Sequence, residues 1–430
     1  MTYTKNISSN FLTRILAIIL NFLVSIFVAR VLGPTGKGYA AYFLMIMSLF
    51  TIYNNFGLES ATIYYQKKSI YKEQNIYNSN NSLMLILGIL NAIVLIFLKK
   101  FNIFFTEYSW DLIFLGSIYL IIMSFKTCSK EFYIGNKKIF LLNRNIIISN
   151  VLKFLFILTF FLIGYLNSKN YIIIMLVNGI ILTVLILKNQ DYFKKFKLNL
   201  DFELYKKEFK YGGIFYLSAL FIFLNYRVDQ FMIKGILDTK SLGIYTIGVT
   251  LAELLFIIPS SIKSALIGEI INKNKLNERR DIISKTIKFT IYISFVLIII
   301  GIFLTPLIPL VYGVDYIDSI DIVIILFWGV LFASIGKVGV SYLYSENKGR
   351  IHLLITSVTL IINLFLNYIL IPRLGINGAA YASTISYGFY GSTYLFYLIK
   401  FGQFSLKNIF LIEKSEINFL IDIIKNKVNY

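Results

Sequence analysis

Apolar runs long enough to cross a lipid bilayer recur along the whole chain of 430 residues, and this feature limits its fold more than any other. A helix needs about 20 apolar residues to cross ~30 Å of hydrocarbon. Because 57% of the residues are hydrophobic and only 15% are charged, the chain has too few polar side chains to cover a water-soluble domain of this size. We therefore predict an all-α polytopic membrane protein.

The apolar runs predict about twelve transmembrane helices, separated by short clusters of Lys, Asn and Asp. In the first half, the predicted spans are residues 11–29, 38–56, 83–98, 112–124, 146–164 and 171–187. In the second half, they are residues 212–228, 242–258, 287–304, 320–335, 352–371 and 378–399. Six spans in each half return the chain to the side of the membrane from which it starts.

The distribution of Lys and Arg predicts the orientation, because cytoplasmic loops carry an excess of these residues. If the N-terminus is cytoplasmic, roughly 32 Lys and Arg lie inside and about 9 lie outside. We therefore expect both termini in the cytoplasm. The net charge of +20 does not indicate nucleic-acid binding, since the basic residues are spread over many loops and suit anionic lipid headgroups.

The sequence has few residues that could bind a metal or carry out covalent catalysis. A single cysteine, Cys128, and a single histidine, His352, cannot form a disulfide framework or a zinc site within one chain. A Gly-rich phosphate loop, a nucleophile elbow and a clustered carboxylate pair are also missing from the sequence. We expect a protein that is not an enzyme, with no catalytic residues, no cofactor and no metal.

The longest predicted cytoplasmic loop, residues 188–211, divides the chain into halves. Residues 201–209 alternate apolar and charged side chains at helical spacing, which is typical of an interfacial helix. We predict an N-terminal six-helix lobe at residues 1–198 and a C-terminal six-helix lobe at residues 199–400 that begins with this linker helix. Residues 401–430 are predicted to be a cytoplasmic amphipathic tail. A weak repeat between residues 132–138 and 342–348 suggests parallel halves.

Three stretches lie in order across nearly the whole chain. They are ARVLGPTGKGY at residues 29–39; RVDQ at 227–230 with LGIY at 242–245 and IIP at 257–259; and NLFLN at 363–367 with IP at 371–372, Gly375 and GAA at 378–380. Together they resemble the Wzx-type O-antigen and capsule polysaccharide flippases, the polysaccharide-transport branch of the multidrug/oligosaccharidyl-lipid/polysaccharide (MOP) flippase superfamily. One departure is Tyr211-Gly212-Gly213, where the resemblance leads us to expect a proline.

The resemblance implies a MATE-like fold of two six-helix lobes around a central cavity that opens alternately to each side. It implies transport of undecaprenyl-diphosphate-linked oligosaccharide from the cytoplasmic to the outer leaflet of a bacterial cytoplasmic (inner) membrane. The product would be O-antigen lipopolysaccharide, capsule or exopolysaccharide. Expected partners are the lipid-linked oligosaccharide, membrane lipids and the polysaccharide polymerase or assembly machinery. The coupling ion, H⁺ or Na⁺, stays open.

Charged residues inside spans are candidates for cargo contact, because a charge at mid-membrane costs ~2.5–3.5 kcal/mol and needs compensation. Lys153 is either a cavity cation facing the diphosphate or a snorkelling or paired structural lysine. Arg14 and Arg30, near the two ends of the first span, either bind phosphate through their guanidinium groups or snorkel to the interface. Arg227 and Asp229 do not share a helical face, so we expect separate partners for them, in transport or in structure.

Three further polar residues lie inside predicted spans. Glu253 is either a protonatable coupling site or the partner of a cavity cation. Asn363 and Asn367 are one helical turn apart and either bind sugar hydroxyls or join neighbouring helices.

Other functions are weighed against a sugar flippase. A MATE-type exporter of small cationic compounds would need acidic residues in its cavity, whereas the charged residues inside the spans are mostly basic. A membrane polysaccharide polymerase or ligase usually needs a sizeable catalytic loop outside the membrane, and the predicted outer loops are short. A flippase for the lipid-linked peptidoglycan precursor would share the fold but would have helices beyond twelve.

Overall fold

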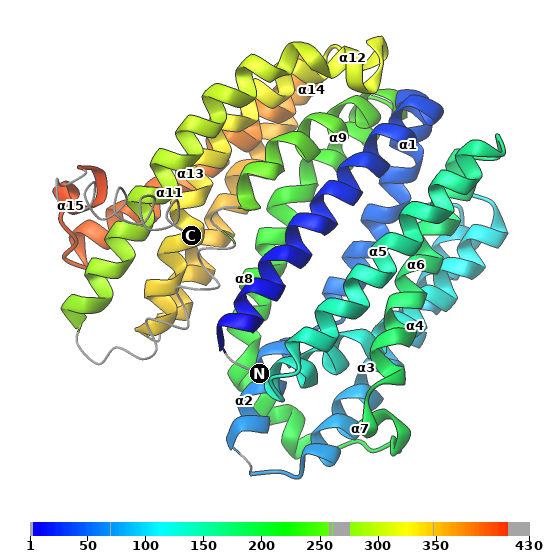
Figure 1. Ribbon diagram of the computed structural model, residues 1–430, viewed down its shortest axis with the longest axis vertical. Coiled ribbons are helices and arrows are strands. Elements are labelled where there is room, and N and C mark those ends of the chain that lie inside the picture. The colour runs from blue at the N-terminus through cyan, green and yellow to red at the C-terminus, as the bar shows by residue number, and fades with distance from the viewer. Residues whose placement is uncertain (1–2, 69, 258–259, 261–275, 347, 412–430) are drawn as a thin grey trace, which may run out of the picture. The chain divides into compact units, whose positions relative to one another are not determined.

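A computed structural model describes residues 3–68, 70–257, 260, 276–346 and 348–411, and every regular element in these residues is a helix (Figure 1). Eight helical stretches among them are long and apolar enough to cross a membrane. The prediction of an all-α polytopic membrane protein is therefore confirmed. The number of twelve crossings stays a prediction.

Contacts between residues divide the chain into two compact units. The first unit comprises Met1–Ile247 with Leu307–Ser319, and the second comprises Gly248–Pro306 with Ile320–Tyr430. Residues 199–247 thus group with the first unit, whereas the sequence suggests a lobe boundary at residue 199. Each unit is described by itself below.

The first unit is a bundle of long helices. It contains α1 (Tyr3–Tyr53), α2 (Leu58–Lys68), α3 (Glu73–Lys100), α4 (Trp110–Gly135), α5 (Ile139–Leu162), α6 (Ser168–Lys188), α7 (Asp191–Lys194), α8 (Phe202–Ile236), the first part of α9 (Thr239–Glu253), α12 (Ile308–Tyr312) and the 3₁₀ turn η3 (Val314–Tyr316). Its largest apolar core includes Val28, Phe43, Leu95, Leu112 and Ile172, which come from α1, α3, α4 and α6. The bundle therefore buries one face of each helix.

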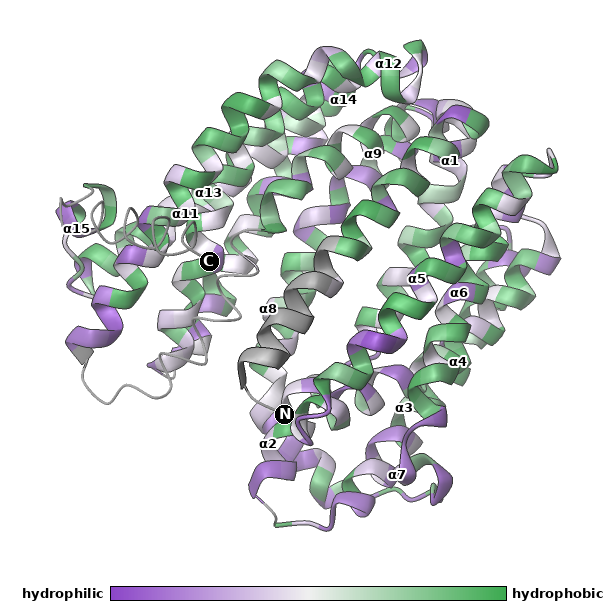
Figure 2. Ribbon diagram, viewed as in Figure 1, coloured by the Kyte–Doolittle hydropathy of each residue, from purple (hydrophilic) through white to green (hydrophobic). Residues whose placement is uncertain are grey.

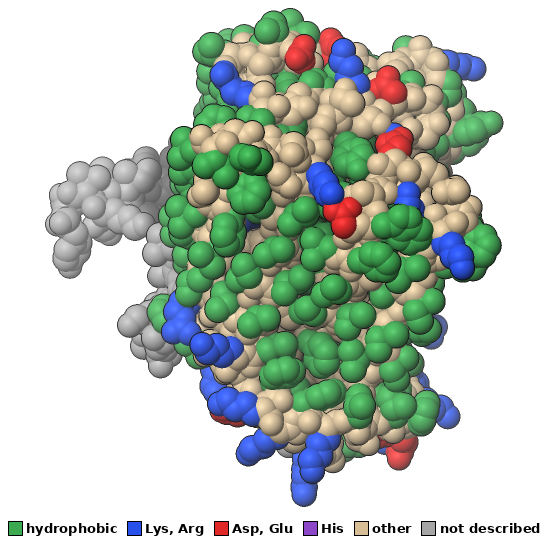
Figure 3. Space-filling view, turned by 90° about the vertical axis from the view of Figure 1, so that its right-hand side faces the viewer, with side chains coloured by type: hydrophobic (Ala, Val, Ile, Leu, Met, Phe, Trp, Pro, Cys, Tyr) green, Lys and Arg blue, Asp and Glu red, His purple; other side chains and the backbone are tan. Residues whose placement is uncertain are grey.

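The outer faces of these helices are apolar over most of their length. Figure 2 shows hydrophobic residues along α4, α5 and α6, and hydrophilic residues around α2 and α7. Figure 3 shows one face of this unit, where apolar side chains cover the middle and Lys and Arg gather at the lower end. A band of exposed apolar side chains between polar ends is what a protein surface in contact with acyl chains requires.

Two very long helices contain a sharp change of direction at a glycine. In α1 the change occurs at Gly33 (φ 62°), which is followed by Pro34, and in α14 (Gly349–Lys400) it occurs at Gly375 (φ 60°), shortly after Pro372. Glycine adopts this left-handed conformation at little cost because it has no Cβ atom. Each of these helices therefore carries two of the predicted spans, one on either side of the glycine.

The polar start of α3 holds the connection between α6 and α8. Residues 78–82 have the sequence NSNNS, and all five are buried. The backbone N–H of Asn199 donates to Ser82 Oγ at 2.9 Å, and the hydroxyl of Tyr205 donates to the Ser79 carbonyl oxygen at 2.7 Å. Residues 189–201 are thus bonded to α3.

The stretch at residues 201–209 is not a helix of its own, and its interfacial position stays a prediction. It is the start of α8, which continues to Ile236 through Gly212 and Gly213 without a break. The alternation of polar and apolar residues reflects burial of Leu204, Tyr205 and Glu208 within the first unit.

The second unit contains the end of α9, η1 (Leu254–Phe256), α11 (Leu276–Leu304), most of η2 (Thr305–Leu307), α13 (Ser319–Ser345), α14 and α15 (Leu406–Phe410). The hydroxyl of Tyr292 donates to the Phe410 carbonyl oxygen at 2.7 Å, which holds α15 against α11. The predicted amphipathic tail begins at residue 401, and its residues 412–430 lie outside the described part of the chain.

Candidate functional site

Lys153 lies on α5 and is buried within the first unit, with 5% of its surface exposed. Its ammonium group donates hydrogen bonds to Oδ1 of Asn21 on α1 and to Oδ1 of Asn150 at 3.1 Å. Within the described residues, no carboxylate forms an ion pair with it. Lys153 is therefore a buried cation that is solvated by two neutral amides.

Polar side chains one turn apart position this lysine. Ser149 Oγ donates to Asn178 Oδ1 at 2.8 Å, and Asn145 Nδ2 donates to the Leu185 carbonyl oxygen at 3.0 Å, so both side chains join α5 to α6. Residues three and four apart lie on neighbouring parts of a helix surface. The same region of α5 thus holds the helix to α6 and directs Lys153 toward α1.

Asn21 is the partner of Lys153 that the sequence analysis missed. It lies in the first apolar run of α1, and its side chain is exposed. An amide within an apolar span was the available signal, since polar groups in spans need a partner. We name Asn21, Asn150 and Lys153 the amide-lysine cluster.

Arg30 lies at the end of the first predicted span, and its exposed guanidinium group reaches the end of α12. Nε donates to the Val311 carbonyl oxygen at 2.7 Å, and Nη2 donates to the Leu310 carbonyl oxygen. These carbonyls lie in the last turn of a helix, where backbone acceptors have no partner within the helix. Binding of a phosphate by Arg30 would compete with these bonds. Arg14 belongs to α1, but its side chain lies outside the described residues.

Asp229 is 2% exposed and joins α8 to α9. Its Oδ2 accepts a hydrogen bond of 2.6 Å from the hydroxyl of Tyr245, and its Oδ1 accepts from the N–H of Gln230. Arg227 is half-buried, and its Nη1 lies 3.4 Å from the Tyr226 carbonyl oxygen. Asp229 therefore has a structural partner on the next helix.

The other three candidates lie in the second unit. Glu253 is the last residue of α9 and is half-buried. Asn363 Nδ2 donates to Ser386 Oγ at 2.8 Å, and Asn367 Nδ2 donates to Asn363 Oδ1 at 2.8 Å. Since Asn363 and Ser386 lie on opposite sides of Gly375, these amides hold the two arms of α14 together.

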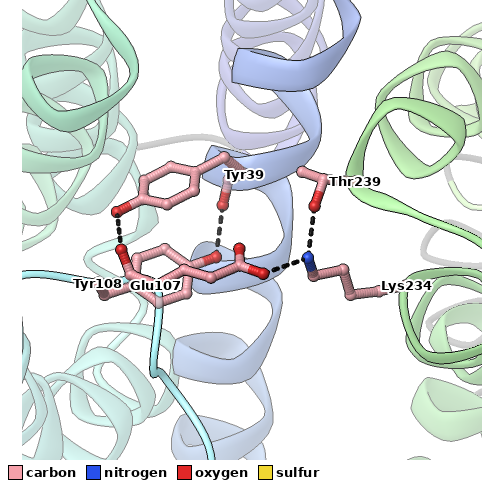
Figure 4. Close-up of polar contacts among 5 residues, drawn as sticks. All are labelled: Tyr39, Glu107, Tyr108, Lys234 and Thr239. Carbon is pink, nitrogen blue, oxygen red and sulfur yellow. Dashed lines mark hydrogen bonds and ion pairs between the residues drawn. The ribbon is translucent and has the colours of Figure 1, made fainter.

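A second polar cluster joins α1, α8 and α9 to the connection between α3 and α4 (Figure 4). Lys234 Nζ forms an ion pair with Glu107 Oε1 at 2.8 Å and also donates to the hydroxyl of Thr239. The hydroxyl of Tyr39 on α1 donates to the Glu107 carbonyl oxygen at 3.2 Å. The hydroxyl of Tyr108 donates in turn to the Tyr39 carbonyl oxygen at 2.8 Å. The sequence analysis missed this cluster, because loop charges are common and give no sign of their partners.

Glycines bring the first and second stretches of the resemblance into contact beside this cluster. A Cβ atom on Gly38 would lie 1.9 Å from the Thr239 carbonyl oxygen, and one on Gly243 would lie 1.8 Å from the Pro34 carbonyl oxygen. Backbones that approach this closely leave no room for a side chain. Gly38 of GKGY and Gly243 of LGIY are therefore required by the packing of α1 on α9.

Comparisons with known proteins show which family the chain resembles. A family model described as "Polysaccharide biosynthesis protein" matches residues 27–321. The capsular polysaccharide biosynthesis protein CapF of Staphylococcus aureus is 24% identical over 395 residues, which cover 89% of this chain and 96% of CapF.

Solved structures show the same fold at low sequence identity. An inward-facing multidrug resistance MATE family transporter of the MOP superfamily has a TM-score of 0.74 and 14% identity, over 90% of this chain and 95% of its own. The lipid II flippase MurJ, in an inward closed conformation, has a TM-score of 0.74 and 17% identity, over 98% of this chain and 92% of its own. The likeness to MATE structures that the resemblance implies is thus confirmed.

Proposed function

Because this chain belongs to the family described as polysaccharide biosynthesis protein, we propose that it is a flippase for lipid-linked sugars. Its cargo would be an undecaprenyl-diphosphate-linked oligosaccharide repeat unit, moved from the cytoplasmic to the outer leaflet by alternating access. The repeat units would supply O-antigen, capsule or exopolysaccharide synthesis at a bacterial cytoplasmic membrane. Likeness to CapF, a capsular polysaccharide biosynthesis protein, supports this cargo class.

The observation that carries the proposal is the amide-lysine cluster. A buried cation is costly unless an opposite charge or several hydrogen bonds compensate it. Lys153 has two amide acceptors and, among the described residues, no carboxylate. Asn21 is exposed on a helix that is apolar enough to cross the membrane, and such an amide is stable beside water or a polar ligand rather than acyl chains. An anionic diphosphate would compensate the charge of Lys153, and the hydrated sugars attached to it would give Asn21 a polar environment.

The two ends of the first unit support a cytoplasmic N-terminus. One end gathers the connections at residues 70–72, 136–138 and 189–201, through contacts such as Gln66 Nε2 to Asn136 Oδ1 at 2.9 Å. The other end gathers residues 101–109 and 237–238 around the Lys234–Glu107 ion pair. The first end holds most of the Lys residues of this unit, which suits the cytoplasmic side.

The two alternative functions have less support. The MATE transporter and MurJ match this chain with the same TM-score, so the fold does not separate a drug exporter from a lipid flippase. A cation without an acidic partner favours an anionic cargo over a cationic drug. A polymerase or ligase would need a catalytic domain outside, but the connections at residues 101–109, 163–167 and 237–238 in the described part of the chain are short.

Depletion of the protein in its host tests the proposal. We expect lipid-linked repeat units to accumulate on the cytoplasmic leaflet, measured by whether they are accessible to a glycan-modifying enzyme added outside. Normal exposure on the outer leaflet in a depleted strain without a redundant flippase would contradict the proposal. Glycosyltransferase and polymerase genes beside this one would agree with it, whereas a drug-responsive regulator would favour the exporter.

A further inference from the structure

Glu208 is a carboxyl group that is completely buried at the start of α8, at 0% exposure. It lies four residues before Gly212, where a Cβ atom would come within 2.3 Å of the Gly57 carbonyl oxygen, so the backbone of α8 is in direct contact with the connection between α1 and α2. In the described residues, no Lys or Arg forms an ion pair with Glu208. The carboxyl group is thus enclosed at a tightly packed joint without a compensating cation.

Glu208 is hydrogen-bonded to Asn80, but each of these side chains keeps one oxygen without a donor among the described residues. Asn80 Nδ2, from the polar start of α3, donates to Glu208 Oε1 at 2.9 Å and to Thr62 Oγ1 at 2.9 Å. Two buried acceptors on these side chains remain without a donor among the described residues, namely Glu208 Oε2 and Asn80 Oδ1. Each buried acceptor without a donor costs ~1–3 kcal/mol, and a carboxylate costs more than a neutral group.

One proton would supply the missing donor. A protonated carboxyl group has an O–H that donates, and the amide that already bonds to Glu208 offers an unoccupied acceptor. The charged form, by contrast, would leave a negative charge on Glu208 beside Asn80 Oδ1, an acceptor without a donor among the described residues. A proton on Glu208 Oε2 would therefore complete the hydrogen bonding of both side chains.

The neighbouring titratable groups do not favour the ionised form of Glu208. Tyr65 on α2, Cys128 on α4, and Asp201 and Tyr205 at the start of α8 interact electrostatically with Glu208, and none of them carries a positive charge. The cation directly before it in the sequence, Lys207, donates to Glu203 Oε1 at 2.6 Å and to the hydroxyl of Tyr71 at 2.8 Å. Ionisation of Glu208 would thus meet no local compensation.

We propose that Glu208 is a proton-binding site that keeps its proton in this conformation, with Asn80 on α3 as its hydrogen-bonding partner. Glu208 precedes the predicted span at residues 212–228, and burial raises the pKa of its carboxyl group from 4.5 to about 8. The Asn80 hydrogen bond lowers this pKa by a smaller amount, and the charge of Asp201 raises it.

The site lies where a conformational change would expose it. Glu208 holds the start of α8 against α2 and α3, and the connection leading into α8 is bonded to the same part of α3. If this joint opens to water, the pKa of Glu208 falls toward its ordinary value and the proton leaves to solvent near neutral pH. A link between this proton and sugar transport would rest on the proposed function, but the proton site itself does not.

Infrared difference spectroscopy on the purified full-length protein tests the site without any cargo. Between about pH 6 and about pH 10, we expect loss of the C=O stretching band of a protonated carboxylic acid as Glu208 ionises. Glu208→Gln should remove this band, since the amide keeps the shape and a donor but cannot titrate. Glu203→Gln is the matched control, because Glu203 is exposed on the same helix and ion-paired with Lys207.

The pH dependence of thermal unfolding in detergent is a second measurement, and it needs only the wild-type protein. Because the folded-state pKa lies above the unfolded value, bound protons stabilise the fold fully below about pH 4.5. This stabilisation decreases as the pH rises and is lost above about pH 8. We expect the unfolding temperature to fall across this window, with a shallower fall in Glu208→Gln.

Three results would overturn the proposal: an infrared band that persists in Glu208→Gln, a band that is lost equally in Glu203→Gln, or a wild-type unfolding temperature that does not fall between about pH 5 and about pH 8. The third result decides the matter even if Glu208→Gln fails to fold. None of these measurements involves lipid-linked sugars, so failure here is distinguishable from failure of the proposed function.

Discussion

The hydroxyl of Tyr245 donates a hydrogen bond of 2.6 Å to Oδ2 of Asp229, and both side chains are buried where α9 packs beside the end of α8. These residues belong to RVDQ and LGIY, two parts of the second stretch that resembles polysaccharide flippases. Their pairing explains why an aspartate and a tyrosine occur 16 residues apart on either side of the turn between α8 and α9. RVDQ and LGIY therefore reflect packing within the first unit.

Replacement of Tyr245 by Phe should lower the stability of the protein. The substitution leaves a buried carboxylate oxygen of Asp229 with one donor fewer, at a cost of ~1–3 kcal/mol. We expect a lower unfolding temperature in detergent, measured by intrinsic fluorescence. Tyr368→Phe is the control, since Tyr368 is 71% exposed on α14. Equal effects of the two substitutions would contradict a structural role for the Tyr245 hydroxyl.

Substitution of Gly38 by Ala should separate α1 from α9. The added Cβ atom would lie 1.9 Å from the backbone oxygen of Thr239, which cannot move as a flexible side chain can. Overpacking of this kind typically costs ~1–3 kcal/mol. Gly235→Ala is a suitable comparison, because nothing lies within 4 Å of its Cβ position and Ala favours a helix. The packing account fails if Gly38→Ala unfolds at or above the wild-type temperature.

Asn363→Ala should weaken the packing between the two arms of α14, which lie on either side of Gly375. Asn363 donates to Ser386 across the turn at Gly375 and accepts from Asn367, so its removal leaves buried polar groups without partners. The expected loss is ~1–3 kcal/mol of stability. For comparison, Thr393→Ala removes a hydroxyl that is exposed and bonded within its own helix. If Asn363→Ala kept its unfolding temperature but lost transport, the amide would act on cargo instead.

The positions of most helices can be predicted from the sequence, but the contacts between helices cannot. Apolar runs predict where helices lie, because the bilayer thickness and the helical rise set a minimum length. The contact of Gly38 with Thr239 joins residues about 200 positions apart, and one sequence has no pattern that reports such a pairing. The continuity of α8 through Gly212 and Gly213 was missed because glycines usually mark a helix end. Here Gly212 allows close contact with Gly57.

The candidate site illustrates the same limit. Lys153 stands out in the sequence as a charge within an apolar run, since membranes penalise such residues. Its partners Asn21 and Asn150 do not stand out, because an amide in a span is as common in helix packing as in cargo binding. The role of Lys153 as a cavity cation or a structural lysine stays a prediction, which the transport activity of its variants tests. The structure shows neutral acceptors.

The strongest test of the proposed cargo is Lys153→Ala. If the ammonium group compensates the diphosphate, its removal should reduce transport of lipid-linked repeat units in reconstituted vesicles by at least about tenfold, the equivalent of ~1.4 kcal/mol. Membrane insertion should be retained, because loss of a buried cation that lacks a carboxylate partner leaves no uncompensated charge behind. The amount of protein in the membrane fraction measures this.

Two comparison variants separate charge from packing at this position. Lys153→Met keeps most of the side-chain volume without the charge, and it should be as impaired as Lys153→Ala. Lys169→Met removes an exposed cation that is ion-paired with Asp111, and it should transport normally. Full transport by Lys153→Met would mean that the ammonium group is dispensable and that the position needs only to be filled. In Lys153→Met, Asn21 and Asn150 face an apolar side chain, so substitution of both by Leu should raise the unfolding temperature of that variant without restoring the transport that it is expected to lose.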